Sequence, residues 1–381
     1  MKIDQKYRIG ILNGSKSCEP SGFLFNRAVH FLKMNGYSVD FRYPLGCPVI
    51  LVNTCCVTKA KMLEAQQLID TALQKKDIEK VVIFGCYAMA FQSKGAGPEP
   101  KMVFVGPREL KSLEKFFAFE HPVDSIKNDS VDPRIFVPYQ TKITDGEHFV
   151  LICQGCKYSC SYCNIKKAKG DVVSRSHDEI LRDIQQASEQ GRDEIVLLAD
   201  DCGSYGADIG SDLVELIQKI CLRHDDIKLK ISNFFPGDFI RLYPRLHCFI
   251  SKGNISYINV PIQSGSRRIL GLMGRKYEVD DVKKIVKEIK SLNPAVWLYT
   301  HLLINFPTET MKDYLESLEA AVLFDEFMII TYSDNPLTRA SKIGPKVDAR
   351  EQEKRLGIAN RVVSLKKRGI VVENMDVDHY A

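Results

Sequence analysis

The spacing of hydrophobic and polar positions changes near residue 140 and divides the chain into two α/β segments. In the first segment, apolar runs of strand length alternate with stretches of helical periodicity, which is typical of a doubly wound parallel sheet. The expected strands are residues 7–12, 48–52 and 81–84, and the expected helices are residues 23–35 and 59–75. A proline-rich linker follows from about residue 97 to 144, with one short helix expected at 109–119.

The second segment has longer repeats in which a strand is followed by a helix. About six such β/α units predict a partial TIM-like barrel that is open on one side. The expected strands are residues 149–152, 194–198, 228–232, 257–260, 297–304 and 327–331, and the expected helices are residues 176–190, 211–222, 280–291 and 311–323.

These patterns predict three parts. An N-terminal doubly wound parallel α/β domain covers residues 1–140, and a partial (β/α)6 TIM-like barrel covers residues 141–345. A basic C-terminal helix, expected at 350–367, and a tail fill residues 346–381.

Length and composition favour a large enzyme of the cytoplasm. The 381 residues can bury a sizeable core, the net charge is only +5, and no apolar stretch is long enough to span a membrane. The N-terminus is polar and does not resemble a signal peptide. Twelve cysteines in such a chain are read as metal ligands and a few inert core thiols rather than as disulfides.

One loop carries three cysteines at C-x3-C-x2-C spacing, Cys156, Cys160 and Cys163, directly after the first expected barrel strand. Three thiolates at this spacing can hold a [4Fe–4S] cluster and leave its fourth iron without a protein ligand. A zinc site would normally need four ligands in paired groupings, and no second pair follows nearby. A chance grouping of buried thiols is the remaining alternative.

This motif resembles that of the radical S-adenosylmethionine (SAM) enzymes. The resemblance implies that SAM chelates the open iron, and that its reductive cleavage produces a 5′-deoxyadenosyl radical that abstracts hydrogen from a C–H bond. Tyr162 matches an aromatic residue that packs near the adenine in those enzymes. An ordinary loop aromatic is the alternative interpretation of Tyr162.

Each expected strand of the N-terminal domain runs into a cysteine. Cys18 follows the first strand, Cys55 and Cys56 follow the second, and Cys86 follows the third. Because ligands gather beyond the carboxyl ends of parallel strands, we expect these thiols to converge on one edge of the sheet and to form a second metal site. Single core cysteines after strands are the alternative.

A series of motifs resembles, in order, the methylthiotransferase family over residues 8 to 345. The motifs are Asn53-Thr54-Cys55, Gly85-Cys86, Gly155-Cys156, Leu197-Leu-Ala-Asp-Asp201, Ser204-Tyr-Gly206, Pro261-Ile-Gln-Ser-Gly-Ser266, Met273-Gly-Arg275-Lys-Tyr277, Phe306-Pro307, Glu309-Thr310 and Tyr332-Ser333. The resemblance implies two [4Fe–4S] clusters, one in a radical SAM barrel and one auxiliary cluster in the N-terminal domain.

Carried over by position, the implied cluster ligands fall into two sets. The barrel set is Cys156, Cys160 and Cys163, and the auxiliary set is Cys18, Cys55 and Cys86. The motif Asn53-Thr-Cys aligns with Cys55, although its neighbour Cys56 remains an open alternative. The other cysteines are read as structural: Cys47, Cys153, Cys202, Cys221 and Cys248.

The family pattern also implies contacts to SAM from Asp201, Gln263 and Ser264 at barrel strand ends. Each of these residues could equally be a helix cap. The implied reaction converts a C–H bond into C–S–CH3, with one SAM giving the radical, a second giving the methyl group, and the auxiliary cluster carrying the sulfur. A reductant of the flavodoxin or ferredoxin type is implied as partner.

Several strand-end residues depart from the family pattern, and three of them are candidates for substrate binding. Phe235 and His301 stand where the family has Glu and Asp, and Asn305 stands where it has Gly. The other departures are Lys166, Thr308 and Asn335. The small C-terminal β-barrel that recruits RNA or protein in the family is not expected, because no strand-rich tail follows the basic helix.

The leading hypothesis is therefore a methylthiotransferase for a small molecule or peptide. A tRNA-modifying enzyme without its recruitment domain ranks second, since the basic C-terminal helix offers phosphate contacts. Sulfur insertion without methylation and a non-catalytic iron–sulfur protein are further alternatives.

Overall fold

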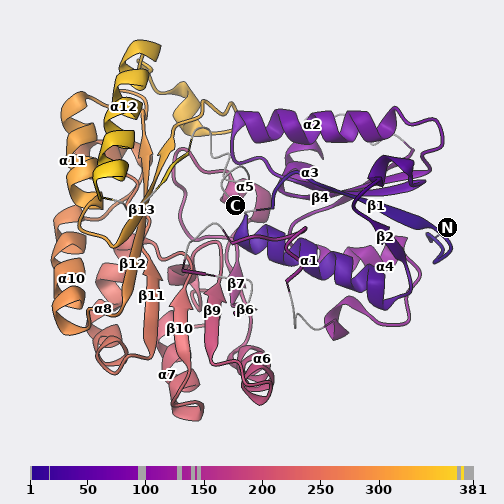
Figure 1. Cartoon of the computed structure of the whole chain (residues 1–381), viewed down its shortest axis with the longest axis horizontal. Coiled ribbons are helices and arrows are strands. Elements are labelled where there is room, and N and C mark those ends of the chain that lie inside the picture. Colours follow the sequence, from indigo (N-terminus) through magenta and orange to yellow (C-terminus); the bar gives the residue numbers. More distant parts are fainter. Residues whose placement is uncertain are drawn as a thin grey trace. The chain divides into compact units, whose positions relative to one another are not determined.

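The computed structural model describes residues 2–16, 18–92, 100–126, 131–138, 142–143, 147–366 and 370–372. They form two compact α/β units, coloured from indigo to magenta and from magenta to yellow in Figure 1. The first unit contains the described residues up to Gly146 together with Asn164–Gly170. The second contains Glu147–Cys163 and the described residues from Asp171 onward.

The first unit is built on a parallel sheet of five strands in the order β2-β1-β3-β4-β5. Its central strand β3 is buried at every position, which explains its continuous apolar sequence. The strands are β1 Arg8–Asn13, β2 Ser38–Asp40, β3 Val49–Thr54, β4 Lys80–Gly85 and β5 Met102–Val105. The helices are α1 Glu19–Met34, α2 Lys59–Leu73, α3 Cys86–Gln92 and α4 Leu113–Phe116, with 3-10 turns η1 Pro44–Gly46, η2 Leu110–Ser112 and η3 Val123–Ser125.

Three strands and two long helices of this unit match the sequence prediction. The edge strands β2 and β5 were not predicted, because they are short and partly exposed and lack a continuous apolar run. The helix expected at 109–119 is only a 3-10 turn followed by the four-residue helix α4. It ends early because Phe117 is extended, fully buried and bridged to Ile3.

The second unit is built on a parallel sheet of seven strands in the order β14-β13-β12-β11-β10-β9-β6. Its strands are β6 His148–Leu151, β9 Glu194–Leu198, β10 Lys228–Ile231, β11 Ile255–Asn259, β12 Trp297–Ile304, β13 Glu326–Thr331 and β14 Ile370–Val372. A separate antiparallel pair is formed by β7 Cys153–Gln154 and β8 Val173–Ser174.

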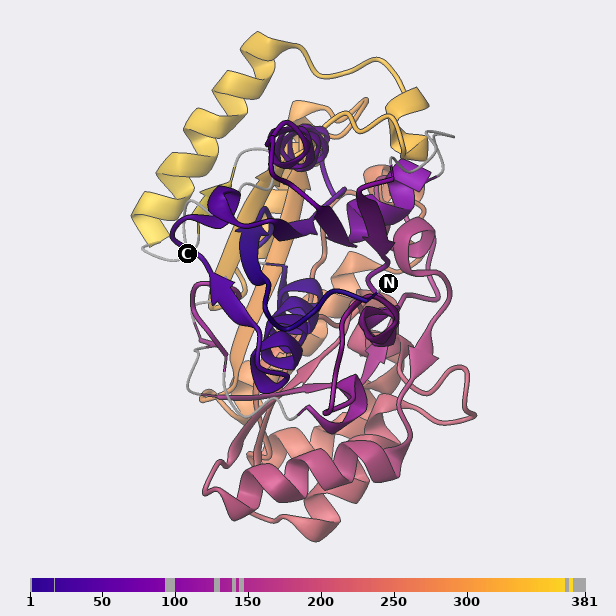
Figure 2. The ribbon, with the colours of Figure 1, turned by 90° about the vertical axis from the view of Figure 1, so that its right-hand side faces the viewer.

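Amphipathic helices connect the strands of the second unit. Ser176 and Thr310 open two of them with capping boxes, which fixes where the helices begin. The neighbouring helices α6 and α7 are seen together in Figures 1 and 2. The helices are α6 His177–Glu189, α7 Leu213–Arg223, α8 Pro236–Ser251, α9 Arg267–Met273, α10 Val279–Leu292, α11 Met311–Ala321 and α12 Ala349–Lys366, with 3-10 turns η4 Cys202–Ser204 and η5 Arg339–Lys342. The short helix α5 Ile165–Lys169 belongs to the first unit.

The six expected barrel strands are present, and a seventh, β14, extends the sheet beyond the boundary expected at residue 345. Residues Met328 to Ile330 of β13 pair in parallel with Ile370 to Val372. The helix α12 is therefore the connection between two barrel strands and not a separate C-terminal element. The three-residue strand was missed because its apolar run is too short to show a period.

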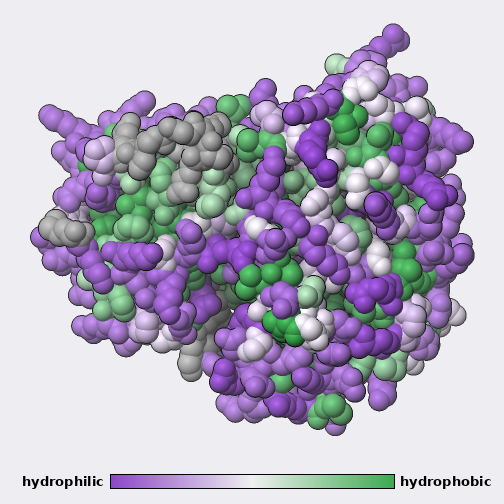
Figure 3. Space-filling view, turned by 180° about the vertical axis from the view of Figure 1, so that it is seen from behind, coloured by the Kyte–Doolittle hydropathy of each residue, from purple (hydrophilic) through white to green (hydrophobic). Residues whose placement is uncertain are grey.

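No helix in the part of the chain that the structure describes is long and apolar enough to cross a membrane. On the face drawn in Figure 3, hydrophilic residues predominate and hydrophobic residues form small separate groups.

Two candidate cysteine centres

The cysteine loop of the second unit is held by hydrogen bonds at both of its ends. Gly155 has a φ of 81°, where a side chain would be strained, and its N–H donates to Asp200 Oδ2 over 2.9 Å. Near the other end, Ser161 donates from its backbone N–H to Met273 O and from its hydroxyl to Leu272 O, over 2.8 and 2.9 Å. The loop is thus fixed against α9 and the strand ends of the same unit.

The thiols of Cys156, Cys160 and Cys163 lie close together in this loop. Burial raises the pKa of Cys156, and the nearby thiols of Cys160 and Cys163 also raise it. The guanidinium of Arg275 donates to Cys160 Sγ over 3.6 Å. Cys153, by contrast, is fully buried and donates its S–H to the carbonyl of Asp201 over 3.7 Å, so it is a core thiol.

The donor set fits a [4Fe–4S] cluster better than a single ion. Among the described residues, no group of Cys, His, Asp or Glu side chains stands at the spacing of ligands to one metal ion. Each cysteine of a cluster binds a different iron of the cube, so cluster ligands stand farther apart than the ligands of one ion.

Phe235 is enclosed between the cysteine loop and Arg275. Its ring stacks on Tyr158 with centroids 3.7 Å apart and planes 18° apart, and Arg275 lies 4.5 Å from its centroid. Tyr158 in turn donates to Asp238 Oδ2 over 2.6 Å. The Phe235 ring is therefore packed against both the cysteine loop and Arg275.

Tyr162 also contacts Arg275, whose Nη1 donates to the Tyr162 hydroxyl over 3.2 Å and whose Nη2 donates to Pro261 O over 2.7 Å. The Nε of Arg275 is buried and has no partner among the residues that the structure describes. Arg275 was not singled out from the sequence. Its signal was a cation within the Met-Gly-Arg-Lys-Tyr motif, and the sequence does not show that this cation is buried.

The three residues expected to contact SAM differ in how their side chains are engaged. The carboxylate of Asp201 accepts from the N–H of Gly203, the N–H of Phe235 and the hydroxyl of Ser204. Ser264 is fully buried, and its hydroxyl shares a 3.0 Å hydrogen bond with Ser317 of α11. Both groups therefore already hold protein structure together.

Gln263 has a different setting. Its φ is 66°, its N–H donates to His301 O over 2.7 Å, and its carbonyl accepts from Leu303 over 2.8 Å. The backbone is thus paired with β12, while the side chain is half-exposed and makes no hydrogen bond to any of the described residues. Of the three, Gln263 has the side chain best placed for a ligand.

His301 lies within β12, and Asn305 directly follows the last residue of this strand. His301 is 7% exposed, its ring meets Tyr299 edge to face, and burial together with Arg275 lowers its pKa to about 3. It is therefore a neutral imidazole.

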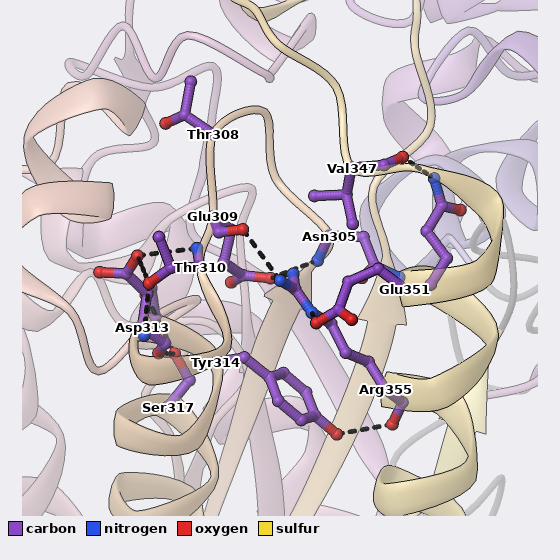
Figure 4. A network of polar contacts seen from close by, with 12 residues as sticks. Asn305, Thr308, Glu309, Thr310, Asp313, Tyr314, Ser317, Val347, Glu351 and Arg355 are labelled. Carbon is purple, nitrogen blue, oxygen red and sulfur yellow. Dashed lines mark hydrogen bonds and ion pairs between the residues drawn. The ribbon is translucent and has the colours of Figure 1, made fainter.

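Asn305 is 3% exposed with a φ of 61°, and neither atom of its carboxamide has a hydrogen-bond partner in the part of the chain that the structure describes. Its backbone N–H donates to Glu309 Oε2 over 2.7 Å, as Figure 4 shows. A buried carboxamide without partners costs free energy, which points to a ligand or water at this position.

The first unit brings its three strand-end cysteines together. Cys18 is the N-cap of α1, Cys55 follows β3, and Cys86 begins α3. Burial raises the pKa of Cys55, and the neighbouring Cys18 and Cys86 raise it further. A hydrogen bond of 3.9 Å joins Cys86 Sγ and the hydroxyl of Ser21 in the first turn of α1.

The structure distinguishes Cys55 from Cys56. Cys55 Sγ accepts from the N–H of Val57 over 3.4 Å and lies beside the other two thiols. Cys56 instead lies near Tyr87 and raises the pKa of that phenol. The carbonyl of Cys56 accepts from the side-chain amide of Asn164 over 3.0 Å. The grouping favours Cys55 as the third member of the set.

Two buried lysines near this set were not singled out from the sequence. Lys61, 6% exposed, lies in the first turn of α2, and Lys169, 3% exposed, ends α5. In the sequence Lys61 belongs to a helix with as many acidic as basic residues and Lys169 to a short basic helix, and only the fold shows that they are buried.

The barrel matches a known protein family. A model of the radical SAM superfamily matches residues 150–321. The solved structure of TsrM from Kitasatospora setae, a radical SAM methyltransferase with cobalamin and a [4Fe–4S] cluster bound, has a TM-score of 0.56 at 14% identity and covers 86% of this chain and 72% of that chain. OxsB, a cobalamin-dependent SAM radical enzyme, has a TM-score of 0.51 at 12% identity over 94% of this chain and 56% of that chain.

Curated relatives match both units. A probable threonylcarbamoyladenosine tRNA methylthiotransferase of Methanothermobacter thermautotrophicus is 28% identical over 81% of this chain and 73% of its own length. The ribosomal protein uS12 methylthiotransferase RimO of Dictyoglomus thermophilum is 29% identical over 86% of this chain and 76% of its own length. A tRNA-2-methylthio-N(6)-dimethylallyladenosine synthase of Lawsonia intracellularis is 28% identical over 81% of this chain and 72% of its own length.

Proposed function

We propose that this chain, which is a radical SAM enzyme homologous to the methylthiotransferases, holds two [4Fe–4S] clusters and converts a C–H group of its substrate into C–S–CH3. The observation that carries the proposal is the presence of two separate three-cysteine sets, one in each unit. A cluster that only carries electrons is usually held by four cysteines, so sets of three favour clusters with an open iron.

In the second unit, Cys156, Cys160 and Cys163 would hold the radical cluster. When bound, this cluster and SAM supply reductive cleavage of the sulfonium and a radical able to abstract hydrogen. The guanidinium of Arg275 donates to Cys160 Sγ and so fixes the position of this sulfur. Phe235, Tyr158 and Asp238 keep the loop in one conformation.

In the first unit, Cys18, Cys55 and Cys86 would hold the auxiliary cluster, whose role is to carry the sulfur. The three cysteines come from loops after three adjacent strands, so the sheet fixes their mutual positions. SAM contacts are assigned to Tyr162 and Gln263, with Asp201 and Ser264 supporting the loops on which these contacts depend.

The substrate proposed for this enzyme is a small molecule or peptide that presents an uncharged group to the barrel. His301 is neutral, Phe235 is apolar, and the carboxamide of Asn305 offers an NH2 group as donor and an oxygen as acceptor. An amide or a similar polar neutral group satisfies these residues, and the nearby cation Arg275 already donates to Cys160, Tyr162 and Pro261.

The proposal is tested by separating radical formation from sulfur transfer. After anaerobic reconstitution, with a flavodoxin or ferredoxin as reductant, the Cys18/Cys55/Cys86→Ala protein should still form 5′-deoxyadenosine but no sulfur-containing product. The Cys156/Cys160/Cys163→Ala protein should form neither. Circular dichroism must first show that both variants are folded, because metal binding contributes to folding.

Sulfur-containing product from a folded Cys18/Cys55/Cys86→Ala protein would contradict the auxiliary role. The mass of the wild-type product separates a methylthio group from a thiol, which tests sulfur insertion without methylation. Wild-type protein that forms no 5′-deoxyadenosine would instead support a non-catalytic iron–sulfur protein.

A second candidate function is modification of tRNA, which the names of two relatives favour. With a net charge of only +5, we expect binding of bulk tRNA to be weak and to vanish near physiological salt. A filter-binding titration at several salt concentrations checks this. Tight, salt-tolerant binding of one tRNA would reverse the order of the two candidates.

A further inference from the structure

The edge strand β2 and its neighbour β1, labelled in Figure 1, border a cavity whose described lining residues all belong to the first unit. Its volume is about 640 Å³, within the roughly 300–1,000 Å³ of small-molecule sites. The lining includes Asn13 and Asp40, the last residues of β1 and β2. The cavity therefore lies at the carboxyl ends of parallel strands, where open α/β sheets bind ligands.

The charge of the lining is positive. Lys16, Arg42 and Arg134 line the cavity together with one carboxylate, Asp40, so the described lining residues carry three positive charges against one negative. Asp40 Oδ1 already accepts from the backbone N–H of Arg42 over 2.9 Å, and Asp40 Oδ2 lies 3.6 Å from Arg8 Nη1. An excess of positive charge in a concave surface attracts an anion.

Arg134 is held in one orientation at this cavity. Its Nε and Nη2 donate to the two carboxylate oxygens of Asp132 over 2.9 and 2.6 Å, and its guanidinium carbon lies 4.3 Å from the centroid of the Phe41 ring. Asp132 is itself anchored, because its backbone N–H donates to Asn26 Oδ1 over 3.0 Å. A guanidinium has five N–H groups, so the pair with Asp132 leaves three of them to donate to a ligand.

Lys16 lies on the loop between β1 and α1, and hydrogen bonds fix this loop at both ends. Asn13 Oδ1 accepts from Asn53 Nδ2 over 2.8 Å, and the carbonyl of Lys16 accepts from the N–H of Val137 over 3.2 Å. The same loop leads to Cys18, two residues beyond Lys16, so their Cα atoms are at most about 7 Å apart. An anion held by Lys16 therefore lies close to one of the cysteines of the first unit.

An apolar part of the lining is formed by Ile11, Val39 and Phe41. Such side chains pack an organic group, which a bare inorganic anion does not provide. A phosphate monoester has an organic part and about two negative charges at neutral pH, which match the excess of two positive charges in the lining. A carboxylate or an internal phosphodiester carries one charge and matches it less well.

We propose that this cavity binds a small molecule through a phosphate monoester. Lys16, Arg42 and Arg134 hold the phosphate, and the apolar residues pack the organic part. The inference goes beyond the proposed function, because neither the cluster ligands nor the barrel residues take part in the binding. The backbone phosphates of a nucleic acid are the competing source of the anion, and the experiment separates them by their charge.

The experiment is isothermal titration calorimetry on the reconstituted full-length protein with three probes: phenyl phosphate, its diester methyl phenyl phosphate, and inorganic phosphate. Phenyl phosphate should bind about tenfold more tightly than the diester, which has the same ring but lacks one charge and one strong hydrogen-bond acceptor. It should also bind more tightly than inorganic phosphate, which has no group for the apolar residues to pack.

Lys16→Met and Arg42→Met should each weaken the binding of phenyl phosphate by about tenfold, the loss expected for one charge-assisted hydrogen bond. Arg42→Lys keeps the charge and should retain most of the affinity. Lys76→Met is the matched control, because Lys76 is an exposed lysine of the same unit and does not line the cavity. It should bind phenyl phosphate as the wild type does.

Iron content and circular dichroism establish that each variant is folded and loaded. If Lys16→Met loads poorly because Cys18 is near, Arg42→Met decides. Wild-type affinity in a loaded Arg42→Met protein overturns the inference, and so does a wild-type protein that binds no phenyl phosphate at millimolar concentration.

Equal affinity of the wild type for phenyl phosphate and methyl phenyl phosphate also overturns the inference and favours a nucleic-acid backbone as the ligand. Formation of 5′-deoxyadenosine should be the same in Arg42→Met and in the wild type. A failure of phosphate binding therefore leaves the proposed function standing, and a failure of radical formation leaves the phosphate site standing.

Discussion

At the scale of single residues, burial decides the protonation state of the groups around both centres. It raises the pKa of Cys55 and Cys156, so these thiols are protonated until a metal displaces the protons. Burial lowers the pKa of His301, and the nearby Arg275 lowers it further, so the imidazole stays neutral at pH values where a histidine is usually protonated. A sequence shows which groups can titrate, and the fold determines which of them do.

His301 should make the protein sensitive to mild acid. Its pKa is about 3 in the folded state against 6.5 for the ordinary group, so below pH 6.5 the unfolded chain binds a proton that the folded chain rejects. Stability that is present above pH 6.5 is therefore lost as the pH falls. At pH 5.5 this single group should cost about 1.4 kcal/mol relative to neutral pH.

Urea unfolding at pH 7.5 and 5.5 checks this expectation. His301→Gln should lose less stability between the two pH values than the wild type, by roughly that amount. His247→Gln, at a side chain that is 44% exposed, is the control and should behave as the wild type does. Equal losses in wild type and His301→Gln would contradict a neutral, buried His301.

Thr308 is a second residue whose conformation predicts a stability effect. Its φ is 69°, which is unfavourable for a β-branched side chain, and its hydroxyl accepts from Arg268 over 3.0 Å. Gly and Ala both remove the hydroxyl, but only Gly adopts this φ without strain. Thr308→Gly should therefore be more stable than Thr308→Ala by about 1 kcal/mol in urea unfolding. Equal stability of the two variants would show that the backbone has relaxed.

At the scale of elements, the sequence predicted the helices and strands whose hydrophobic residues recur at a clear helical or strand period. It missed the short strands that form only because they pair with a neighbouring strand. Strand β3 and helix α10 are apolar on the faces that they bury, so pattern alone located them. The edge strands β2 and β5 and the last barrel strand β14 have three or four residues each, and pairing with a neighbour is what makes them strands. Such pairing depends on segments distant in the sequence.

Helix α12 shows the same limit. Its sequence is basic and suggested a solvated surface, yet Arg355 is 2% exposed. Figure 4 shows its guanidinium against Glu309, with Nη1 2.8 Å from Oε2, while Glu351 Oε1 accepts from Nε over 3.1 Å. Because Glu309 also binds the N–H of Asn305, α12 supports the end of β12 where the substrate is proposed to bind.

Replacing Arg355 by Met should destabilise the protein by about 3 kcal/mol, because it leaves the buried carboxylate of Glu309 without its partner. The double variant Arg355→Met/Glu309→Gln should recover part of this loss, since the uncompensated charge is then removed. Arg350→Met on the exposed side of α12 should change little. Chemical unfolding of the four proteins measures this, and a double variant no more stable than Arg355→Met would contradict the ion-pair explanation.

At the scale of the whole molecule, the order of the cysteines along the chain indicated both centres before the structure was known. Cys156, Cys160 and Cys163 share one loop, so their spacing alone predicts a cluster. Cys18, Cys55 and Cys86 are far apart in sequence, and only the parallel order of β1, β3 and β4 places them at one sheet edge. Arg275 lies within the Met273-Gly-Arg275-Lys-Tyr277 motif, but its contact with Cys160 depends on burial that the sequence does not show.

The division into two units leads to a prediction about iron content. Each three-cysteine set lies within one unit, so each should assemble its own cube, and reconstituted protein should contain about eight irons and eight sulfides per chain. Replacing either set by alanine should leave about four of each, because the other unit keeps its ligands. Cys56→Ala should retain the full amount, since Cys56 lies beside Tyr87, whereas Cys55→Ala, at the thiol beside Cys18 and Cys86, should lose iron. Iron and sulfide analysis with Mössbauer spectra measures these contents, and Cys248→Ala, at an exposed thiol, is the control.

Wild-type protein that never exceeds one cluster would contradict the auxiliary centre. Loss of both clusters from one folded triple variant would show that the two units do not load independently.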